Sequence, residues 1–266
     1  MQNSSTRPLA VVTGASRGIG YELAAQFAAN GFDLVVNAED AGLAEAAAAL
    51  SATGAQVEPV RADLATYDGV EALWSAIQAT GRPVDAVALN AGVGVSGDFA
   101  TSTDLEAELA LLNLNVTSAV HLAKRVLPDM VARGSGRILF TSSVAATMPG
   151  PFYAVYAASK AFLLSFAEAI RYELKDSGVS ITALMPGPTD TDFFRRAGME
   201  DTRAGTSYQD DPAEVARQGF EALMAGKDHV VAGVQNKALT TAAKVLPETV
   251  KAAAHARLTE PGSGSS

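Results

Sequence analysis

The residue types best suited to moving a proton lie in the segment 156–160, which reads YAASK. On a helix, a phenol and an ammonium four positions apart share one face. A phenol with an ordinary pKa of about 10 is a poor base at neutral pH, and a nearby cation favours its ionised form. The spacing therefore indicates an acid–base pair built on Tyr156 and Lys160. The alternative is a solvated pair on a helix surface, which the same pattern also produces.

A second informative group is the glycine turn 13–20, which reads TGASRGIG and follows an apolar segment. Its glycines, Gly14, Gly18 and Gly20, would allow a tight turn, close approach of a pyrophosphate and close packing of the next helix. The start of that helix would offer free N–H groups and the positive end of its dipole to phosphates. The spacing G-x-x-x-G-x-G departs from the common G-x-G-x-x-G, and a tight turn without a ligand is the alternative.

The same turn also matches the G-x-S-x-G elbow of hydrolases, with Ser16 as the nucleophile. An elbow serine needs an acid and a histidine, and the histidines of the chain are His121, His229 and His255. The elbow would also be unusual on the first strand, before most of a sheet exists. We therefore set the hydrolase interpretation aside.

Elements that could position these residues alternate along the chain as short apolar segments and longer helical ones. The expected strands are 9–13, 33–37, 57–60, 84–89, 137–141, 179–184 and a weak one at 229–232. The expected helices include 18–30, 41–53, 67–80, 106–133 and 152–175. Strands separated by helices predict parallel βαβ units, and apolar strands imply that both sheet faces are covered. We expect an α/β fold: a single doubly wound (Rossmann) domain over residues 1–266, with a mostly parallel seven-stranded sheet.

Composition narrows the possible classes of protein. A chain of 266 residues can bury a substantial core, and 48% hydrophobic with 18% charged residues is ordinary for a globular protein. A net charge of −9 disfavours nucleic acid as a partner. The absence of cysteine excludes disulfides and thiolate metal sites, and we expect no metal. Without a signal peptide or a long apolar run, we expect a cytoplasmic protein with no membrane partner. Residues 1–7 and 260–266 are expected to be mobile tails.

Taken in order, the motifs resemble the short-chain dehydrogenase/reductase family. They are Thr13-Gly14-(x)3-Gly18-Ile19-Gly20, Asp63-Leu64, Asn90-Ala91-Gly92, Asn115, Ser143, Tyr156-(x)3-Lys160 and Pro186-Gly187. The resemblance runs from about Leu9 to Gly233, and each motif lies at its expected strand end. It implies an NAD(P)-dependent oxidoreductase, an alcohol dehydrogenase or carbonyl reductase, that transfers a hydride between nicotinamide and a carbonyl or alcohol.

The resemblance also implies a role for each residue of the reaction centre. Tyr156 would be the general acid in reduction and the general base in oxidation. Lys160 would hold the nicotinamide ribose and lower the pKa of the tyrosine. Ser143, thirteen residues before Tyr156, would hydrogen-bond the substrate oxygen, and its neighbour Ser142 fits that spacing less well. Asn115 would help to hold a water that links Lys160 to solvent, or else it is a polar residue of helix packing.

Tyr153 is a competing phenol, but the residue four positions after it is Ala157 rather than a lysine. The dinucleotide implied by the resemblance would lie along the strand ends, where open α/β sheets bind ligands. There Asp63 would contact the adenine, and Pro186 would flank the nicotinamide amide. The full set of expected contacts is Gly14, Ser16, Arg17, Gly18, Ile19, Gly20, Ala38, Glu39, Asp63, Leu64, Asn90, Ala91, Gly92, Tyr156, Lys160, Pro186, Gly187 and Thr189.

The features that bear on the choice of dinucleotide disagree. Arg17 is placed to pair with a 2′-phosphate, as in many NADP-preferring relatives, although a solvated loop arginine is the alternative. Ala38 stands where NAD-preferring relatives carry an acid that binds the ribose diol. Glu39 stands where many NADP-preferring relatives carry arginine, and its carboxylate should repel a phosphate. Because Ala38 lacks the diol-binding acid, we expect NADP(H) to be slightly favoured over NAD(H).

The expected substrate wall is mostly apolar, which favours a hydrophobic ketone or secondary alcohol as the small-molecule substrate. Its candidates are Val93, Val95, Ala145, Phe152, Tyr153, Phe193, Phe194 and Met199. Residues 189–210 are expected to form a substrate lid. The helices 106–133 and 152–175 are apolar on more than one face, which predicts a homotetramer or a homodimer. A non-catalytic dinucleotide-binding sensor on the same fold is the alternative function.

Overall fold

The computed structural model describes residues 7–233, 236–237, 240 and 246–265. Its centre is a seven-stranded parallel sheet with the order β3-β2-β1-β4-β5-β6-β7. The strands are β1 (Leu9–Thr13), β2 (Asp33–Ala38), β3 (Val57–Arg61), β4 (Val84–Leu89), β5 (Gly136–Thr141), β6 (Val179–Met185) and β7 (His229–Val231). The predicted doubly wound α/β fold is therefore confirmed.

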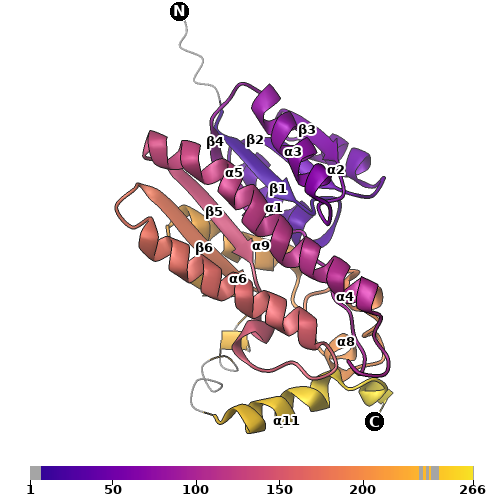
Figure 1. The fold of residues 1–266 in the computed structure, drawn as a ribbon. Coiled ribbons are helices and arrows are strands. Elements are labelled where there is room, and N and C mark those ends of the chain that lie inside the picture. The colour runs from indigo at the N-terminus through magenta and orange to yellow at the C-terminus, as the bar shows by residue number, and fades with distance from the viewer. Residues whose placement is uncertain (1–6, 234–235, 238–239, 241–245, 266) are drawn as a thin grey trace, which may run out of the picture.

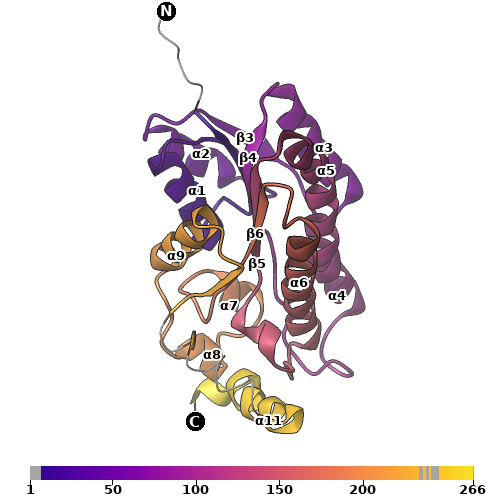
Figure 2. The same cartoon turned by 90° about the vertical axis from the view of Figure 1, so that its left-hand side faces the viewer.

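Helices cover both faces of the sheet (Figure 2). One face carries α1 (Gly18–Ala29), α2 (Leu43–Ser51) and α9 (Pro212–Met224). The other carries α3 (Tyr67–Ala79), α5 (Ser118–Arg133) and α6 (Ala154–Glu173). Alternate residues of β1 enter the two cores, Val12 on the first face and Val11 on the second. Because both faces are buried, the strands are apolar throughout instead of alternating.

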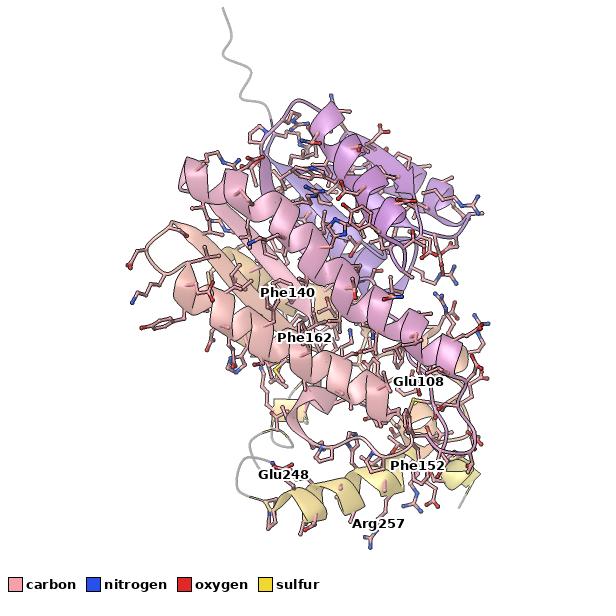
Figure 3. The ribbon with its side chains drawn as sticks, viewed as in Figure 1. Glu108, Phe140, Phe152, Phe162, Glu248 and Arg257 are labelled. Carbon is pink, nitrogen blue, oxygen red and sulfur yellow. The ribbon has the colours of Figure 1, made fainter. Side chains whose placement is uncertain are left out.

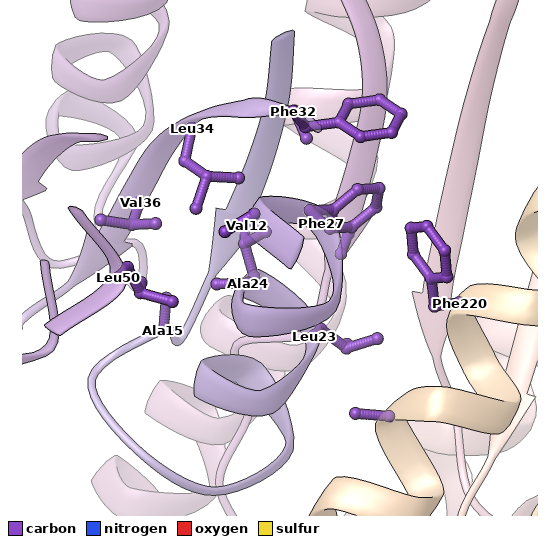
Figure 4. Close-up of a cluster of buried hydrophobic side chains, with 14 of the residues drawn as sticks. Val12, Ala15, Leu23, Ala24, Phe27, Phe32, Leu34, Val36, Leu50 and Phe220 are labelled. Atoms are coloured by element: carbon purple, nitrogen blue, oxygen red, sulfur yellow. The ribbon is translucent and has the colours of Figure 1, made fainter. Parts of the chain in front are cut away.

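The core under α1 joins segments that are far apart in the sequence (Figure 4). Phe27 of α1 meets Phe32 and Phe220 edge-on, with ring centroids 5.2 Å apart in each pair. Phe220 comes from α9, so this contact fixes a late helix against the first one. Each fully buried phenylalanine contributes roughly 1.5–3 kcal/mol of burial free energy. This packing holds the glycine turn, at the start of α1, in place on the sheet.

The helix predicted over 106–133 is divided in the structure. It consists of α4 (Leu105–Leu112), a π-helical segment η1 (Asn113–Thr117) and α5. A π-helical segment inserts one extra residue into a helix, and such segments are frequent at functional sites. This segment could not be predicted from the sequence, because a single extra residue hardly disturbs the apolar pattern. The segment places Asn115 beside the end of β4, as described below.

Several further helical elements gather at the carboxyl end of the sheet (Figure 1). They are η2 (Val144–Thr147), α7 (Phe193–Arg196), α8 (Arg203–Thr206), α11 (Glu248–Thr259) and η3 (Ser263–Ser265). The helix α11 lies across this end of the molecule, close to α8 (Figure 1). None of the helices in the described ranges is both long and apolar enough to cross a membrane.

The predicted mobile tails lie partly outside the described residues. Residues 1–6 and 266 lie outside the described residues. Residues just before 266 instead lie on the segment that was predicted to be the lid. The Gly262 N–H donates to the Asp201 carboxylate at 2.9 Å, and the Gly264 N–H donates to the Asp201 carbonyl at 2.7 Å. These bonds give the C-terminal residues a defined place that their composition did not indicate.

Candidate active site

Hydrogen bonds join the carboxyl ends of β1, β4 and β5. The Thr13 hydroxyl accepts the N–H groups of Asn90 at 2.9 Å and Ala91 at 3.0 Å. The Asn90 amide donates to the Thr13 carbonyl at 3.1 Å and accepts from the Thr141 hydroxyl at 3.1 Å. Asn90 therefore links the carboxyl ends of β1, β4 and β5. This is a more specific role than that of a loop residue that merely follows a strand.

The glycine turn has the shape that a phosphate group needs. Gly14 and Gly18 have φ of 68° and 56°, the left-handed region that glycine adopts without strain. A Cβ atom on Gly20 would lie 2.1 Å from the Gly14 carbonyl oxygen, so only glycine lets α1 begin there. Among the described residues, no side chain caps α1 through its N-cap, Arg17. The first N–H groups of α1 thus remain available to an anion, and the residues present fit the pyrophosphate of a dinucleotide.

One cavity runs from this turn along the strand ends to α7 and α11. Every residue that the sequence predicted to contact a dinucleotide lines it, from Gly14 through Asp63 to Thr189. Ser143, Tyr156 and Lys160 line the same cavity. In the described part of the chain, Asn115 is the predicted site residue that does not line it, since its side chain is 1% exposed and lies behind the wall.

Tyr156 lies in the first turn of α6, with its ring between those of Tyr153 and Phe193. Burial raises the pKa of Tyr156 to about 12, and a hydrogen bond with the Ser143 hydroxyl opposes this rise. The Ser143 hydroxyl also accepts the Ala145 N–H at 3.1 Å, which fixes its orientation. At neutral pH the phenol is therefore protonated and can donate to an oxygen bound beside it.

Lys160 lies one turn further along α6 and reaches the same buried space. Its Nζ donates to the Thr141 carbonyl at 2.9 Å and lies 5.6 Å from the centroid of the Tyr156 ring. Burial lowers the pKa of Lys160 to about 8. The sequence predicted that the lysine would lower the pKa of the tyrosine. In the structure desolvation dominates, so the pKa of Tyr156 is raised, because burial disfavours the charged form of both groups.

Asn115 joins the π-helical segment to the end of β4 and to α6. Its amide accepts the Val93 N–H and donates to the Val93 carbonyl, both at 2.9 Å. The amide also donates to the Ser159 hydroxyl at 3.1 Å. A Cβ on Gly92 would lie 3.1 Å from Asn115 Oδ1 and 3.3 Å from Lys160 Nζ, so both polar groups approach the backbone at a glycine. The structure thus gives Asn115 a positioning role, and its part in a water relay stays a prediction.

Comparison with known proteins decides the family. Residues 8–201 match the family model of the short chain dehydrogenases. The chain belongs to that family. It is 34% identical to the ketoacyl reductase HetN of Nostoc sp. over 195 residues. The aligned region covers 73% of this chain and 66% of HetN, slightly less than two thirds of that protein.

Solved structures of short-chain dehydrogenases show the same architecture. The enzyme from Sphingobium yanoikuyae, in complex with NADPH, superposes with a TM-score of 0.79 at 30% identity, covering 89% of this chain and 94% of that one. A second one, from Burkholderia phymatum in complex with NAD, superposes with a TM-score of 0.78 at 26% identity, covering 88% and 92%. This chain is therefore an oxidoreductase of the short-chain dehydrogenase family.

The hydrolase interpretation fails within this short-chain dehydrogenase. The Ser16 hydroxyl donates to the Asp40 carboxylate at 2.8 Å. Each histidine has a partner elsewhere: His121 pairs with Glu71, His229 with Asp228 and His255 with Tyr153. Ser16 is consequently a residue of the glycine turn and not a nucleophile.

Ser142, the weaker candidate beside Ser143, has a structural partner. Its hydroxyl donates to the Lys160 carbonyl at 2.7 Å, which ties the end of β5 to α6. Both serines line the cavity. The Ser142 hydroxyl is engaged with the Lys160 backbone, and Ser143 is the serine whose hydroxyl influences the pKa of Tyr156.

The predicted substrate wall is largely present in the cavity. Val93, Ala145, Tyr153, Phe193, Phe194 and Met199 line it. Within the described residues, Val95 and Phe152 do not line it. Val95 packs against the apolar cluster that contains Tyr156, and Phe152 lies in the loop before α6. Sequence reasoning missed Ala254, His255, Leu258 and Thr259, which line the cavity from α11. No motif in α11 could have indicated them, since its apolar residues are small and irregularly spaced.

Ion pairs surround the end of the cavity beside Ala38. Arg17 pairs with Asp40 at 3.0 Å and with Asp192 at 3.1 Å. Glu39 pairs with Arg196 of α7 at 3.2 Å. The carboxylate that the sequence predicted to repel a phosphate therefore has a cationic partner from the 189–210 segment, which the sequence did not indicate.

Proposed function

We propose that this chain is an NAD(P)-dependent carbonyl reductase or alcohol dehydrogenase acting on a hydrophobic ketone or secondary alcohol. The observation that carries the proposal is the buried set Ser143, Tyr156 and Lys160, which shares one cavity with the glycine turn. The complexes of two similar enzymes with NADPH and NAD support a nicotinamide dinucleotide as the ligand of that turn. When bound, the dinucleotide supplies the hydride chemistry.

The residues of the chain supply orientation and the proton. The Ser143 hydroxyl donates to the substrate oxygen and stabilises the negative charge that develops there. Tyr156, protonated at neutral pH because its pKa is about 12, transfers its proton to that oxygen and becomes a phenolate. The Lys160 ammonium stabilises the phenolate, since a cation nearby favours the ionised form. In oxidation the same phenolate accepts the proton of the alcohol.

The apolar lining supports the substrate class. Val93, Phe193, Phe194 and Met199 surround the space beside Tyr156, and few charged groups are available there to bind a polar acid. We propose bulky or hydrophobic ketones as substrates, and the residues of the glycine turn, together with Asp63, Gly92 and Gly187, as the dinucleotide site.

A paired titration and turnover assay tests this function. Purified protein is titrated with NADPH and with NADH, with fluorescence as the signal, and is then assayed on a panel of carbonyls. We expect micromolar binding of at least one nucleotide and its oxidation in the presence of hydrophobic ketones. Turnover confined to sugars or small polar acids would contradict the substrate class. Nucleotide binding without any turnover would favour the sensor.

We propose further that NADP(H) is preferred, because Arg17 and Arg196 bring two guanidinium groups beside Ala38. Arg17→Ala should weaken NADPH binding by roughly 10- to 100-fold, since a hydrogen bond to a charged group contributes about 1.5–3 kcal/mol. The affinity for NADH should change much less. Dissociation constants from the same titration measure both effects.

Arg195→Ala is the matched control for Arg17→Ala. Arg195 also pairs with Asp192, at 2.9 Å, but it does not line the cavity in the described structure. It should leave the ratio of the two affinities unchanged. Equal losses of NADPH and NADH binding in Arg17→Ala would contradict the assignment of Arg17 to a 2′-phosphate.

We also propose that the chain forms a homotetramer or homodimer. Exposed apolar side chains on α4 and α6 support this: Leu105, Leu109 and Phe162 are 70%, 50% and 44% exposed. Exposed apolar patches of this kind mark interaction surfaces. Light scattering of the purified protein gives the mass in solution, and a monomer would contradict the proposal.

A further inference from the structure

The helix α11 completes the reaction cavity from outside the region that matches the family model. Residues 8–201 match that model, whereas α11 spans Glu248–Thr259. It lies across the carboxyl end of the sheet, with Glu248 and Arg257 marking its course and Phe152 above it (Figure 3). Its residues His255 and Thr259 line the same cavity as Tyr156. One wall of the cavity thus comes from the C-terminal part of this chain, beyond the residues that match the family model.

His255 is a buried polar residue with both ring nitrogens in use. Its Nδ1 lies 2.8 Å from the Pro149 carbonyl oxygen. A carbonyl can only accept, so Nδ1 carries the proton, and Nε2 of the neutral ring accepts from the Tyr153 hydroxyl. Burial lowers the pKa of His255, which keeps the ring in this neutral form. His255 therefore connects α11 to two points of the loop before α6.

A third hydrogen bond from α11 secures the same loop one helical turn later. The Thr259 hydroxyl donates to the Pro151 carbonyl at 2.8 Å. From the opposite side, the Gly97 N–H donates to the Phe152 carbonyl at 2.7 Å. Phe152 has φ of 63°, a left-handed conformation that is costly for a bulky residue. Such a conformation persists only where surrounding contacts impose it, and α11 supplies three of these contacts.

The loop leads directly to the reacting phenol. Tyr153 is the N-cap of α6, and within the described residues its side chain makes no capping bond to the helix. Its ring instead stacks on that of Tyr156, with centroids 5.5 Å apart and planes inclined by 18°. The hydroxyl of the same ring is tethered to His255. The position of Tyr156 is thus linked through one stacked ring to α11.

We propose that His255 is a positioning residue for Tyr156, acting through Tyr153 to hold the reacting phenol in its productive orientation. This inference rests on the proposed function, since it requires Tyr156 to transfer a proton. If His255 positions Tyr156, the rate of the chemical step depends on α11, which also forms part of the cavity wall. The dinucleotide site is formed by other elements, so nucleotide affinity should not depend on His255.

Steady-state kinetics of three variants test the proposal. His255→Ala should lower kcat for ketone reduction by roughly 10- to 100-fold, because a displacement of about 1 Å can cost about 100-fold. The KM for the ketone and the dissociation constant of the nucleotide should change by less than about threefold. Tyr153→Phe, which keeps the stacked ring and removes the hydroxyl, should lower kcat similarly. The double variant should be no slower than either single one, since both remove the same link.

His255→Gln is the conservative rescue, because its Oε1 can accept from the Tyr153 hydroxyl. It should recover a large part of kcat, which a purely structural role in packing α11 would not predict. His229→Ala is the matched control: His229 pairs with Asp228 at the surface and should behave as the wild type.

The outcomes separate this inference from the proposed function. A wild type that binds nucleotide but reduces no carbonyl would contradict the proposed function. A wild type that reduces ketones, with unchanged kcat in Tyr153→Phe and in folded His255→Ala, would contradict the positioning role alone. Additive losses in the double variant would also overturn it. If His255→Ala does not fold, Tyr153→Phe and His255→Gln still decide the question.

Discussion

Replacing Tyr156 with phenylalanine should lower kcat for ketone reduction by roughly 100-fold or more, the usual contribution of a general acid. The variant keeps the aromatic ring, so the contacts with Tyr153 at 5.5 Å and Phe193 at 5.1 Å remain. It loses only the O–H group that gives the proton to the substrate oxygen. Nucleotide affinity should be nearly unchanged. Initial rates and the fluorescence titration, on one protein preparation, measure both quantities.

Tyr172→Phe is the matched control for Tyr156→Phe, since Tyr172 lies on the same helix and is 71% exposed. It should retain the activity of the wild type. If Tyr156→Phe kept a tenth or more of the wild-type kcat, the proton would have to come from another group. Ser143 would then be the first residue to test, because its hydroxyl lines the same cavity and influences the pKa of the phenol.

The order of short apolar strands and longer helices was sufficient to predict the doubly wound fold. The site followed from it, because the carboxyl ends of parallel strands meet at one edge of the sheet. Gly14, Asn90 and Ser143 are far apart in the sequence, yet Gly14 and Asn90 directly follow a strand and Ser143 comes two residues after one. Residue type and distance from a strand end were therefore enough to bring them to one cavity.

Features that depend on pairing between distant segments could not be predicted. The ion pair of Glu39 with Arg196 spans 157 positions, and the bond of Tyr153 with His255 spans 102. Neither partner carries a local pattern that indicates the other. The direction of the Tyr156 pKa shift could not be predicted from the sequence either, because it depends on how completely the phenol is removed from water. The lysine nearby was visible in the motif, but its own burial was not.

Burial of Lys160 should appear as a pH dependence of stability in the nucleotide-free protein. The pKa of the lysine falls from an ordinary 10.5 to about 8 on folding. Between these values the unfolded chain binds more protons than the native one, so the free energy of unfolding rises with pH. Below pH 8 both states carry the charge, and the native state bears the full cost of burying it. Between pH 7 and pH 9.5 the expected rise is about 2 kcal/mol.

Lys160→Met removes this contribution while nearly preserving the length of the side chain. Urea unfolding at pH 7, 8, 9 and 9.5 gives the unfolding free energy of each protein. Other lysines titrate in both proteins, so their effects cancel in the difference between the wild type and the variant. That difference should increase by about 2 kcal/mol across the range in favour of the wild type. The lost bond to the Thr141 carbonyl adds a constant offset and leaves the slope unaffected.

Lys175→Met is the matched control, since Lys175 lies just beyond the same helix and is exposed. Because its side chain is exposed, the substitution removes no buried charge, and the turnover of Lys175→Met should match that of the wild type. A flat difference for Lys160→Met would mean that the buried amine keeps an ordinary affinity for protons. The kcat of Lys160→Met should also fall by roughly 100-fold, because no cation would then stabilise the phenolate that Tyr156 becomes. Lys160 is thus expected to lower the stability of the protein near neutral pH and to raise its reaction rate. Such a compromise between stability and activity is expected of a buried charge in an active site.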